Sequence, residues 1–163
     1  MIQRRIHHGF SLIELLTTLA IMALLAALAV PLLGDNDALG LGVARRLLIS
    51  DLEHAQILAI THPNSKIGLV LKQSGQGWYI ASLDDPATPL SDSVSGEPLA
   101  TELGSGPASS AERVYVETNA ISNTITFNQH GGLSDFTQSV EFTLVSGEKT
   151  AMISVSPSTG SIN

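Results

Sequence analysis

An apolar run occupies residues 10–33 and limits how this chain can fold. As a helix, the run would be about 36 Å long at roughly 1.5 Å per residue, which is enough to cross the hydrocarbon core of a bilayer. Arg4 and Arg5 lie just before it, and positive charge is biased toward the cytoplasmic side of a membrane. We therefore predict a single-pass transmembrane helix over 10–33, with a cytoplasmic amino terminus.

Two simpler explanations of this run are a secretory signal peptide and a plain membrane anchor. A signal peptide has a shorter apolar core, and the small residue that marks its cleavage site follows that core. Here the run is longer, and the small residue Gly9 precedes it. A plain membrane anchor would gain nothing from Glu14, the acidic residue inside the run.

Glu14 needs a partner if it enters a membrane. An ionised carboxylate near the membrane core costs roughly 2.5–3.5 kcal/mol on insertion scales. No lysine, arginine or histidine occurs between Phe10 and Leu33, so the partner must come from another chain or from a new amino terminus. A cut between Gly9 and Phe10 would create a positive amine four residues from Glu14, and a neighbouring copy could supply that amine.

The residues around this position resemble the processing site of type IV prepilins and type II secretion pseudopilins, with the sequence Gly9, Phe10, Ser11, Leu12, Ile13 and Glu14. The resemblance implies that a prepilin peptidase removes a leader of residues 1–9. It also implies that the amine of Phe10 is methylated. Glu14 would then pair with the Phe10 amine of an adjacent subunit during filament assembly.

An amphipathic helix is predicted over residues 34–62. Apolar and small residues recur there every three or four positions: Leu41, Ala44, Leu48, Leu52, Ala55 and Ala59. Pro31, Gly34, Gly40 and Gly42 predict a bent or locally melted connection to the first helix, and Pro63 predicts the end of the helix.

The rest of the chain, residues 63–163, is predicted to form a β-rich domain. Alternating patterns indicate a hairpin at "KIGLVLK" and "WYIASL" and further strands at 113–117, 124–127, 140–145 and 151–155. Residues 84–112 are rich in Pro, Ser, Gly and acids and predict a long surface loop. Trp78 and Tyr79 are adjacent on a strand, so they should face opposite sides of the sheet. The fold class is therefore α+β, with a long amino-terminal helix packed on an antiparallel sheet.

The segments "ITFNQHGGLSDF" and "ISVSPSTGSIN" also resemble the carboxy-terminal part of the GspH and FimT branch of pilin-like proteins. Some pilins of that branch bind DNA through basic residues near the carboxy terminus. Thr159 and Gly160 match the branch, but Ser161 and Asn163 stand where arginines would be expected. All fifteen acidic residues follow Gly9, against six of the eight basic ones. We therefore expect no nucleic-acid partner.

Other polar clusters predict no catalytic residue, metal site or cofactor. Glu53, His54 and His62 lack the HExxH spacing of a zinc site and suggest a solvated helix face. His130 precedes two glycines and suggests an exposed turn. Asp35 and Asp37 are expected to cap or approach the second helix, because the glycine and glutamate of a calcium loop are absent.

The resemblance favours a non-enzymatic minor pseudopilin of the type II secretion system, held in the inner membrane with its domain in the periplasm. Its expected partners are other pseudopilins or pilins, contacted through the amino-terminal helix, and the prepilin peptidase. A FimT-like minor pilin that primes a type IV pilus is the alternative within this class. A membrane-tethered periplasmic enzyme or binding domain is the alternative outside it.

Overall fold

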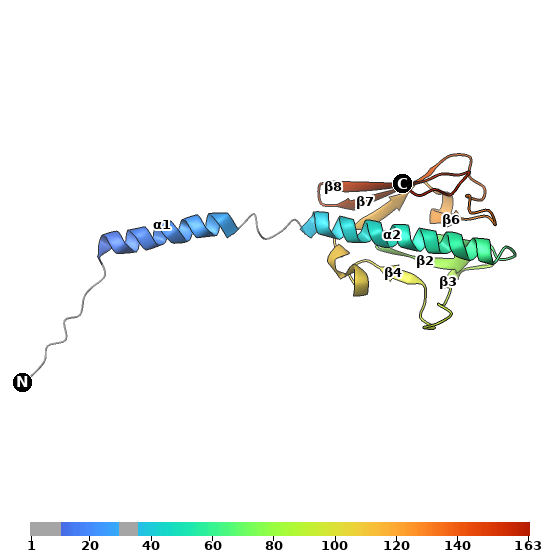
Figure 1. The fold of residues 1–163 in the computed structure, drawn as a ribbon, viewed down its shortest axis with the longest axis horizontal. Helices are drawn as coiled ribbons and strands as arrows, with labels where there is room; N and C mark the ends of the chain where they lie inside the picture. Colours follow the sequence, from blue (N-terminus) through green and yellow to red (C-terminus); the bar gives the residue numbers. More distant parts are fainter. Residues whose placement is uncertain (1–10, 30–35) are drawn as a thin grey trace, which may run out of the picture. The chain divides into compact units, whose positions relative to one another are not determined.

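The computed structural model describes residues 11–29 and 36–163. The chain divides into two compact units, residues 1–35 and residues 36–163 (Figure 1). The predicted leader 1–9, the cleavage position at Gly9 and Phe10, and Pro31 lie outside the described residues.

Helix α1 (Leu12–Ala29) is the described element of the first unit. Leucine and alanine, which are strong helix formers, dominate its sequence, and no glycine or proline interrupts it. The Ser11 carbonyl accepts the first helical hydrogen bonds, from the backbone amides of Glu14 and Leu15. The hydroxyls of Thr17 and Thr18 donate back to carbonyls one turn earlier.

Helix α2 (Asn36–Thr61) confirms the predicted amphipathic helix. Its buried residues are those of the predicted apolar face together with Gly40. The helix runs through Gly40 and Gly42, so the interruption predicted at these two glycines is wrong. At Gly40, a Cβ atom would lie 2.7 Å from the Ser110 carbonyl oxygen, so this glycine allows a close approach of a neighbouring segment.

Five strands form the first antiparallel sheet: β1 (Ile67–Leu71), β2 (Gly77–Ser82), β3 (Asp85–Pro89), β4 (Ala100–Glu102) and β6 (Thr124–Thr126). The order is β3-β2-β1-β6, and β4 also pairs with β2. The predicted hairpin is β1 and β2, with Val70 opposite Tyr79. Trp78 is fully buried whereas the Tyr79 hydroxyl donates to the Pro86 carbonyl at 2.9 Å, which confirms their opposite orientations.

Three strands form a second antiparallel sheet in the order β5-β7-β8: β5 (Tyr115–Thr118), β7 (Val140–Ser146) and β8 (Lys149–Val155). The predicted turn between the last two strands is present, with Gly147 at φ 58°. After β8 the chain returns, and Ile162 pairs with Val155 in an isolated bridge. The predicted antiparallel β-sheet domain therefore consists of two sheets.

Residues 84–112 differ from the predicted long surface loop. They contain β3, β4 and a short 3-10 helix, η2 (Gly106–Ala111); a second one, η3 (Ile121–Asn123), follows further along the chain. Strand β3 is almost entirely exposed, but Ala108 and Ala111 of η2 are buried. Because α2 and η2 approach each other closely at Gly40, the contact between them has room only for small side chains such as Ala108 and Ala111.

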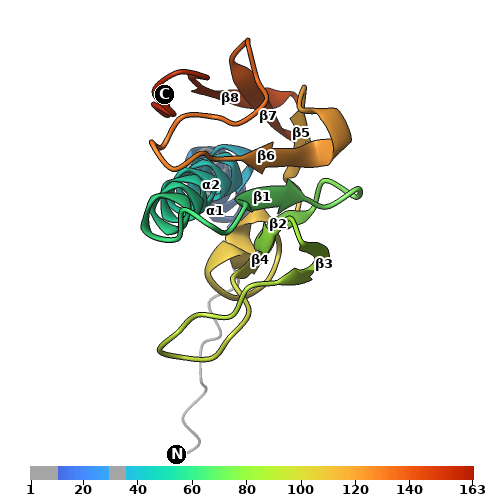
Figure 2. The same cartoon turned by 90° about the vertical axis from the view of Figure 1, so that its right-hand side faces the viewer.

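The core of the second unit lies where α2 meets both sheets. Helix α2 contacts β1 on one side and β7 and β8 on the other, and Figure 2 shows the two sheets arranged around it. The largest fully buried side chains of this core include Trp78, Phe142, Leu48 and Leu52. One helix therefore holds two sheets in a single domain.

Candidate functional site

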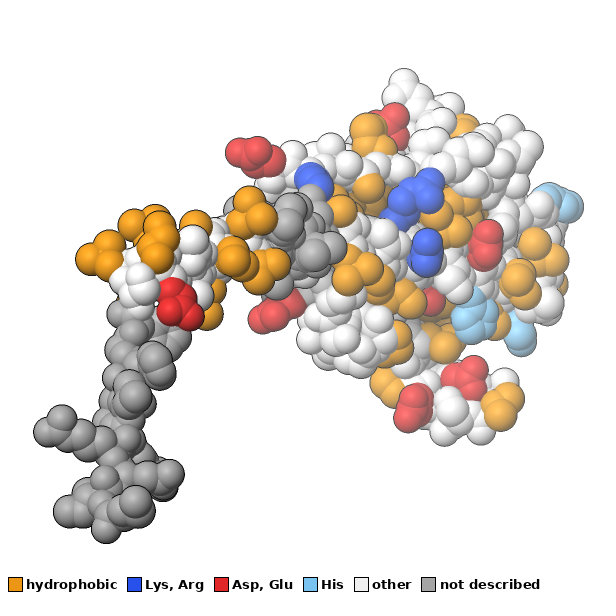
Figure 3. Space-filling view, turned by 60° about the vertical axis from the view of Figure 1, so that its left-hand side comes forward, with side chains coloured by type: hydrophobic (Ala, Val, Ile, Leu, Met, Phe, Trp, Pro, Cys, Tyr) orange, Lys and Arg blue, Asp and Glu red, His pale blue; other side chains and the backbone are white. Residues whose placement is uncertain are grey.

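The described surface of α1 is mostly apolar, and its polar side chains, Glu14, Thr17 and Thr18, lie in the first turns. Every side chain from residue 11 to residue 26 is exposed, and Figure 3 shows that apolar side chains make up most of this surface, beside an acidic one. The exposed fractions include 81% for Leu12 and 69% for Met22. Since removing apolar surface from water contributes roughly 25 cal/mol per Å², such a helix is stabilised by a lipid or protein environment.

Glu14 is the acidic residue in the first turn of α1, and the last turn carries no basic residue. A negative charge at this position interacts favourably with the positive end of the helix dipole. The ion pairs among the described residues are Lys72–Glu102 and Arg113–Asp37, so Glu14 belongs to neither. Its predicted partner, the Phe10 amine of a neighbouring chain, lies outside the described residues.

The predicted membrane span 10–33 extends beyond α1 at both ends. Within residues 11–29 and 36–163, no helix combines the length and apolar character needed to traverse a bilayer.

Two acidic side chains of α2 attach the helix to the rest of its domain. Asp51 Oδ2 accepts hydrogen bonds from Trp78 Nε1 and Thr101 Oγ1, each at 2.7 Å. Asp37 Oδ1 accepts from Ser146 Oγ at 3.0 Å. These bonds connect α2 to β2, β4 and the end of β7. Asp37 lies in the first turn of α2 and makes this tertiary contact, whereas Asp35 lies outside the described residues.

Gln56 connects α2 to the carboxy-terminal segment. Its Nε2 donates to the Gly131 carbonyl at 2.6 Å and reaches the Gly160 carbonyl at 3.3 Å. Gly160 has φ 64° and faces the Gly131 carbonyl so closely that a Cβ atom would clash with it. The Thr-Gly pair near the carboxy terminus therefore serves as a structural turn against α2.

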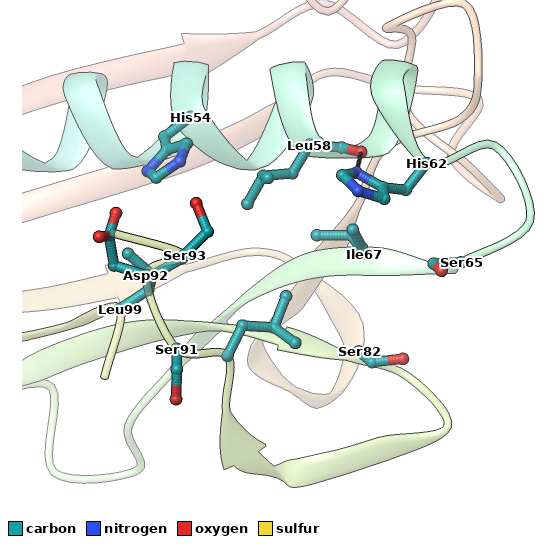
Figure 4. A pocket seen from close by; sticks show the side chains of 11 residues that line it. His54, Leu58, His62, Ser65, Ile67, Ser82, Ser91, Asp92, Ser93 and Leu99 are labelled. Atoms are coloured by element: carbon teal, nitrogen blue, oxygen red, sulfur yellow. Dashed lines mark hydrogen bonds between the residues drawn. The ribbon is translucent and has the colours of Figure 1, made fainter. Parts of the chain in front are cut away.

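A groove of about 370 Å³ lies between the last turns of α2 and residues 90–99. His54, Leu58 and His62 face it at four-residue spacing, and Figure 4 shows His54 across the groove from Asp92. Its apolar lining comes from Leu58, Ile67, Leu90 and Leu99, and serine side chains line the remainder.

Asp92 organises the loop that forms one side of this groove. Its carboxylate accepts from the Ser95 and Val94 amides at 2.7 and 2.9 Å and from the Ser95 hydroxyl. These hydrogen bonds, the Ser95 amide first, hold the pKa of Asp92 below its usual value, and positive charge on His54 acts in the same direction. The loop is therefore fixed by an ionised Asp92.

The histidines do not form a metal centre in the part of the chain that the structure describes, where no three metal-ligating side chains come together. Glu53 and His62 are exposed, as expected for a solvated face, but His54 is half-buried against the groove. His130 is exposed in a turn, where its amide donates to Asn128 Oδ1.

The carboxy terminus is polar rather than basic. The Asn163 and Ser154 backbones exchange two hydrogen bonds at 3.0 Å each. The Ser161 amide donates to the Thr159 hydroxyl at 3.2 Å. The residues expected to be arginines in a DNA-binding relative are thus part of a local backbone turn.

The chain matches two protein families along most of its length. Residues 4–30 match the prokaryotic N-terminal methylation motif, and residues 44–159 match the family of type II transport protein GspH. The second match covers more than two thirds of the chain.

Similar proteins include pilins. The pilin-like protein PilA1 of Thermus thermophilus is 37% identical over 99 residues, which are 60% of this chain and 61% of that protein. This chain thus spans about three fifths of that relative. Two crystal structures of the type IV minor pilin FimU of Pseudomonas aeruginosa PAO1 give TM-scores of 0.50 and 0.51 at 20% identity. They cover 75% of this chain and 89% and 84% of the FimU chains.

The FimU similarity establishes the fold, an amino-terminal helix packed on antiparallel β-structure. The two family matches account for the processing motif and the domain separately. The chain therefore belongs to the GspH family, within the type IV pilin-like proteins.

Proposed function

We propose that this chain is a minor pseudopilin of the type II secretion system, anchored in the inner membrane with residues 36–163 in the periplasm. The match of residues 44–159 to type II transport protein GspH is the observation that carries this proposal. The exposed apolar surface of α1 supports it, because a filament or a membrane would cover that surface. Members of this pilin-like family are structural subunits, so the chain is not an enzyme.

Processing precedes assembly in this proposal. The prepilin peptidase cleaves between Gly9 and Phe10, and the new amine of Phe10 is methylated, in keeping with the methylation motif over residues 4–30. Glu14 then pairs with the Phe10 amine of an adjacent subunit. Because hydrophobic contacts between apolar helices have no direction, this pair would set the register of the subunits.

Mass spectrometry of the mature chain tests the processing step. We expect a chain that begins at Phe10 and carries one added methyl group. An intact amino terminus at Met1, or a cut beyond residue 30, would refute the processing site. The substitution Gly9→Ala, which preserves the charges of the leader, checks that cleavage depends on this glycine.

The substitution Glu14→Ala tests assembly. We expect the variant to insert into the membrane as wild type does, since a costly buried charge is removed, and to be lost from sheared or purified filaments. Thr17→Ala is a matched control, because it changes a polar residue one turn away whose hydroxyl bonds only to its own helix. Normal incorporation of Glu14→Ala would contradict the assembly role.

A minor type IV pilin is the second candidate function. The pilin-like relative and the FimU-like fold favour it. A deletion strain separates the two functions, because loss of exported proteins from the medium with normal surface fibres indicates secretion. Loss of surface fibres with normal export indicates the pilus.

A further inference from the structure

Strand β8 is an edge strand of the second sheet, and its outer edge is only partly paired. On its other edge, β8 pairs with β7 over its whole length without a register shift. On the outer edge, Ser154 exchanges two hydrogen bonds with Asn163, and the Ser156 amide donates to the Ser161 carbonyl. Among the described residues this outer pairing stops at Ser154, so residues 150–152 have no neighbouring strand on that side.

The backbone groups at this open edge, residues 150–152, follow from the alternation of an antiparallel strand. Residues whose amide and carbonyl face one edge recur at every second position. Those of Ser154 face outward, so those of Met152 and Thr150 face outward as well, while those of Ala151 turn toward β7. Met152 and Thr150 therefore present two N–H and two C=O groups in the spacing that a further strand would use.

Other sheet edges are protected in ways that β8 is not. Strand β3 contains two prolines, and its pairing with β2 has a register shift, two features that discourage further pairing. Beside β6 the Ser134 amide donates to the Thr126 carbonyl, and beside β5 the Val116 amide donates to the Gly75 carbonyl. Strand β8 has neither a proline nor a bulge. Its open edge is therefore suited to receive an added strand.

Helix α2 packs against β8 and contributes basic side chains beside this open edge. Gln56 identifies the side of the helix toward β8, because its amide donates to the Gly160 carbonyl in the segment that follows the strand. Arg45 lies eleven residues earlier, and at about 100° per residue the two side chains project within roughly 20° of each other. Arg46, the next residue, is exposed. Both arginines are therefore on or next to the β8 side of the helix.

The position of Arg45 along the helix is level with the open edge. Asp37 Oδ2 lies 2.9 Å from the point that a Cβ atom of Gly147 would occupy, so the first turn of α2 and the turn before β8 lie side by side. Arg45 is about 12 Å from Asp37 along the helix axis, and Ala151 is about 13 Å from Gly147 along the strand. A long arginine side chain at this level reaches toward a strand placed outside β8.

The charges beside the open edge indicate the chemistry of its partner. Arg45 is half-buried and Arg46 is exposed, and neither belongs to an ion pair among the described residues. Lys149 adds a positive charge at the start of β8, where a lysine opposes an uncharged strand but attracts an acidic one. Glu148, in the turn before the strand, is exposed and offsets part of this charge. The balance beside the open edge is positive, although the whole chain has a net charge of −7.

A second copy of this chain is a poor source of such a strand. Its acid-rich segment 84–97 is already in use, because β3 pairs with β2 and the Asp92 carboxylate fixes the loop that follows. The occupant that fits the open edge is therefore an extended acidic segment of a different protein.

We propose that the open edge of β8, residues 150–152, binds an extended acidic segment of a different protein as an added strand, with Arg45 and Arg46 contacting its carboxylates. Main-chain hydrogen bonds hold the segment, and its alternate side chains determine specificity. The Met152 side chain, which is 59% exposed, packs beside the side chains of the added strand. Neither α1 nor Glu14 takes part, so the proposal stands apart from the proposed function and from its tests.

Peptide binding to the full chain in detergent micelles tests the proposal. The probe is a fluorescent peptide with blocked ends, Val-Glu-Val-Glu-Val, whose alternation places both carboxylates on one face. We expect a saturable rise in fluorescence polarisation. A peptide with lysine in place of glutamate should bind roughly fivefold or more weakly, and an analogue methylated at its backbone nitrogens, which cannot donate hydrogen bonds, should not bind.

Two results of this comparison would overturn the proposal. One is the absence of saturable binding at concentrations on the order of 1 mM. The other is equal binding of the acidic peptide and either control peptide, since strand addition requires the backbone donors and the arginines require the carboxylates.

Variants of the chain locate the bound peptide. Met152→Pro removes an outward N–H and leaves the pairing of β8 with β7 in place, so binding should weaken roughly 3- to 10-fold, as for the loss of a hydrogen bond. Met152→Ala keeps the N–H and is the matched control. Arg45→Glu should weaken binding by a similar factor, whereas Lys66→Glu makes the same charge change at an exposed site before β1 and should have little effect. Unchanged binding in Met152→Pro or in Arg45→Glu, with a normal circular dichroism spectrum, would overturn the proposal.

Hydrogen exchange of the wild-type full chain gives a readout that needs no substitution. The bound acidic peptide should slow exchange at residues 150–152 and leave β5 unchanged. Protection confined to another region, such as the groove beside residues 90–99, would overturn the assignment to β8. Protection of residues 150–152 that rises with protein concentration in the absence of peptide would identify a second copy as the occupant and overturn the choice of a different protein. Loss of assembly in Glu14→Ala is measured separately, so failure of either proposal leaves the other intact.

Discussion

The hydrogen bonds of Asp51 predict that this residue holds α2 onto the first sheet. Asp51→Ala removes the acceptor of two bonds, those from Trp78 Nε1 and from Thr101 Oγ1, both at 2.7 Å. Trp78 itself is fully buried. The substitution therefore leaves a buried indole N–H without its partner.

The expected loss of stability follows from these two contacts. Leaving a buried donor unsatisfied costs about 1–3 kcal/mol, and a hydrogen bond to a charged group contributes about 1.5–3 kcal/mol. The two contributions overlap, because both describe the same Trp78 contact, and water can reach the half-exposed Thr101 hydroxyl. We therefore expect Asp51→Ala to lower the free energy of unfolding by about 2–4 kcal/mol.

Urea denaturation measures this change. Trp78 is the only tryptophan of the chain, so its fluorescence reports unfolding at the substituted site, and circular dichroism reports the whole domain. Asp51→Asn keeps an acceptor oxygen without the charge, and we expect it to lose about 1 kcal/mol. Glu53→Ala changes an exposed acid on the same helix, and we expect a change within about 0.5 kcal/mol.

A double-mutant cycle with Thr101→Val isolates one of the two bonds. If Asp51 stabilises the Thr101 hydroxyl as the distances indicate, the loss from Thr101→Val should shrink in the Asp51→Ala background by about 0.5–1.5 kcal/mol. An Asp51→Ala variant as stable as Glu53→Ala would refute the reasoning, since the buried indole would then have found another partner.

Three further changes have defined outcomes. Gly40→Ala should destabilise the domain by about 1–3 kcal/mol in urea denaturation, because its Cβ would lie 2.7 Å from the Ser110 carbonyl oxygen, whereas Gly42→Ala, in open space, should stabilise it by up to about 1 kcal/mol. Asp92→Asn should accelerate hydrogen exchange at the amides that its carboxylate binds. The wild-type loop should lose the same protection as the pH falls from about 4 through the lowered pKa of Asp92. A lowered carboxyl pKa contributes its full stability above the usual pKa, and that stability is lost as the pH falls through the lowered one. Gln56→Ala should lower the free energy of unfolding by about 1 kcal/mol, because it removes the hydrogen bond to the Gly131 carbonyl. Hydrogen exchange in the turn at residue 131 should become faster, and an unchanged exchange rate there would contradict the role of Gln56.

The elements with a local pattern were predictable from the sequence. Helix α2 has apolar residues every three or four positions, and the β1–β2 hairpin has two alternating segments around a glycine-containing turn. Both patterns reflect which side chains face the core. The strands β5 to β8 were located for the same reason, within one or two residues for β6, β7 and β8.

The elements that depend on distant partners were not predictable. Strands β3 and β4 contain few large apolar residues, and they exist because β2 offers them hydrogen bonds, for example between Trp78 and Thr101. The partners of Asp51 lie 27 and 50 residues away, so its sequence neighbours give no indication of them. The sequence gives no local sign of the role of Gly40, because η2, which requires this glycine, lies far along the chain.

The two helices of the chain would contribute differently to the proposed assembly of subunits. Beyond Thr18, the described side chains of α1 are apolar, so burial of this part stabilises association without selecting a displacement along the helix. The displacement of neighbouring α1 helices relative to each other must therefore be set by polar groups. Glu14 is the one acidic group in the first turn of α1, and a single charge can fix only one point. Helix α2 is held to its own domain by Asp37, Asp51 and Gln56, so a contact on its outward face would fix the orientation of the whole domain. A contact at Glu14 would therefore act on the first unit, and a contact on the outward face of α2 would act on the second, so each unit needs polar groups of its own to fix its place in an assembly.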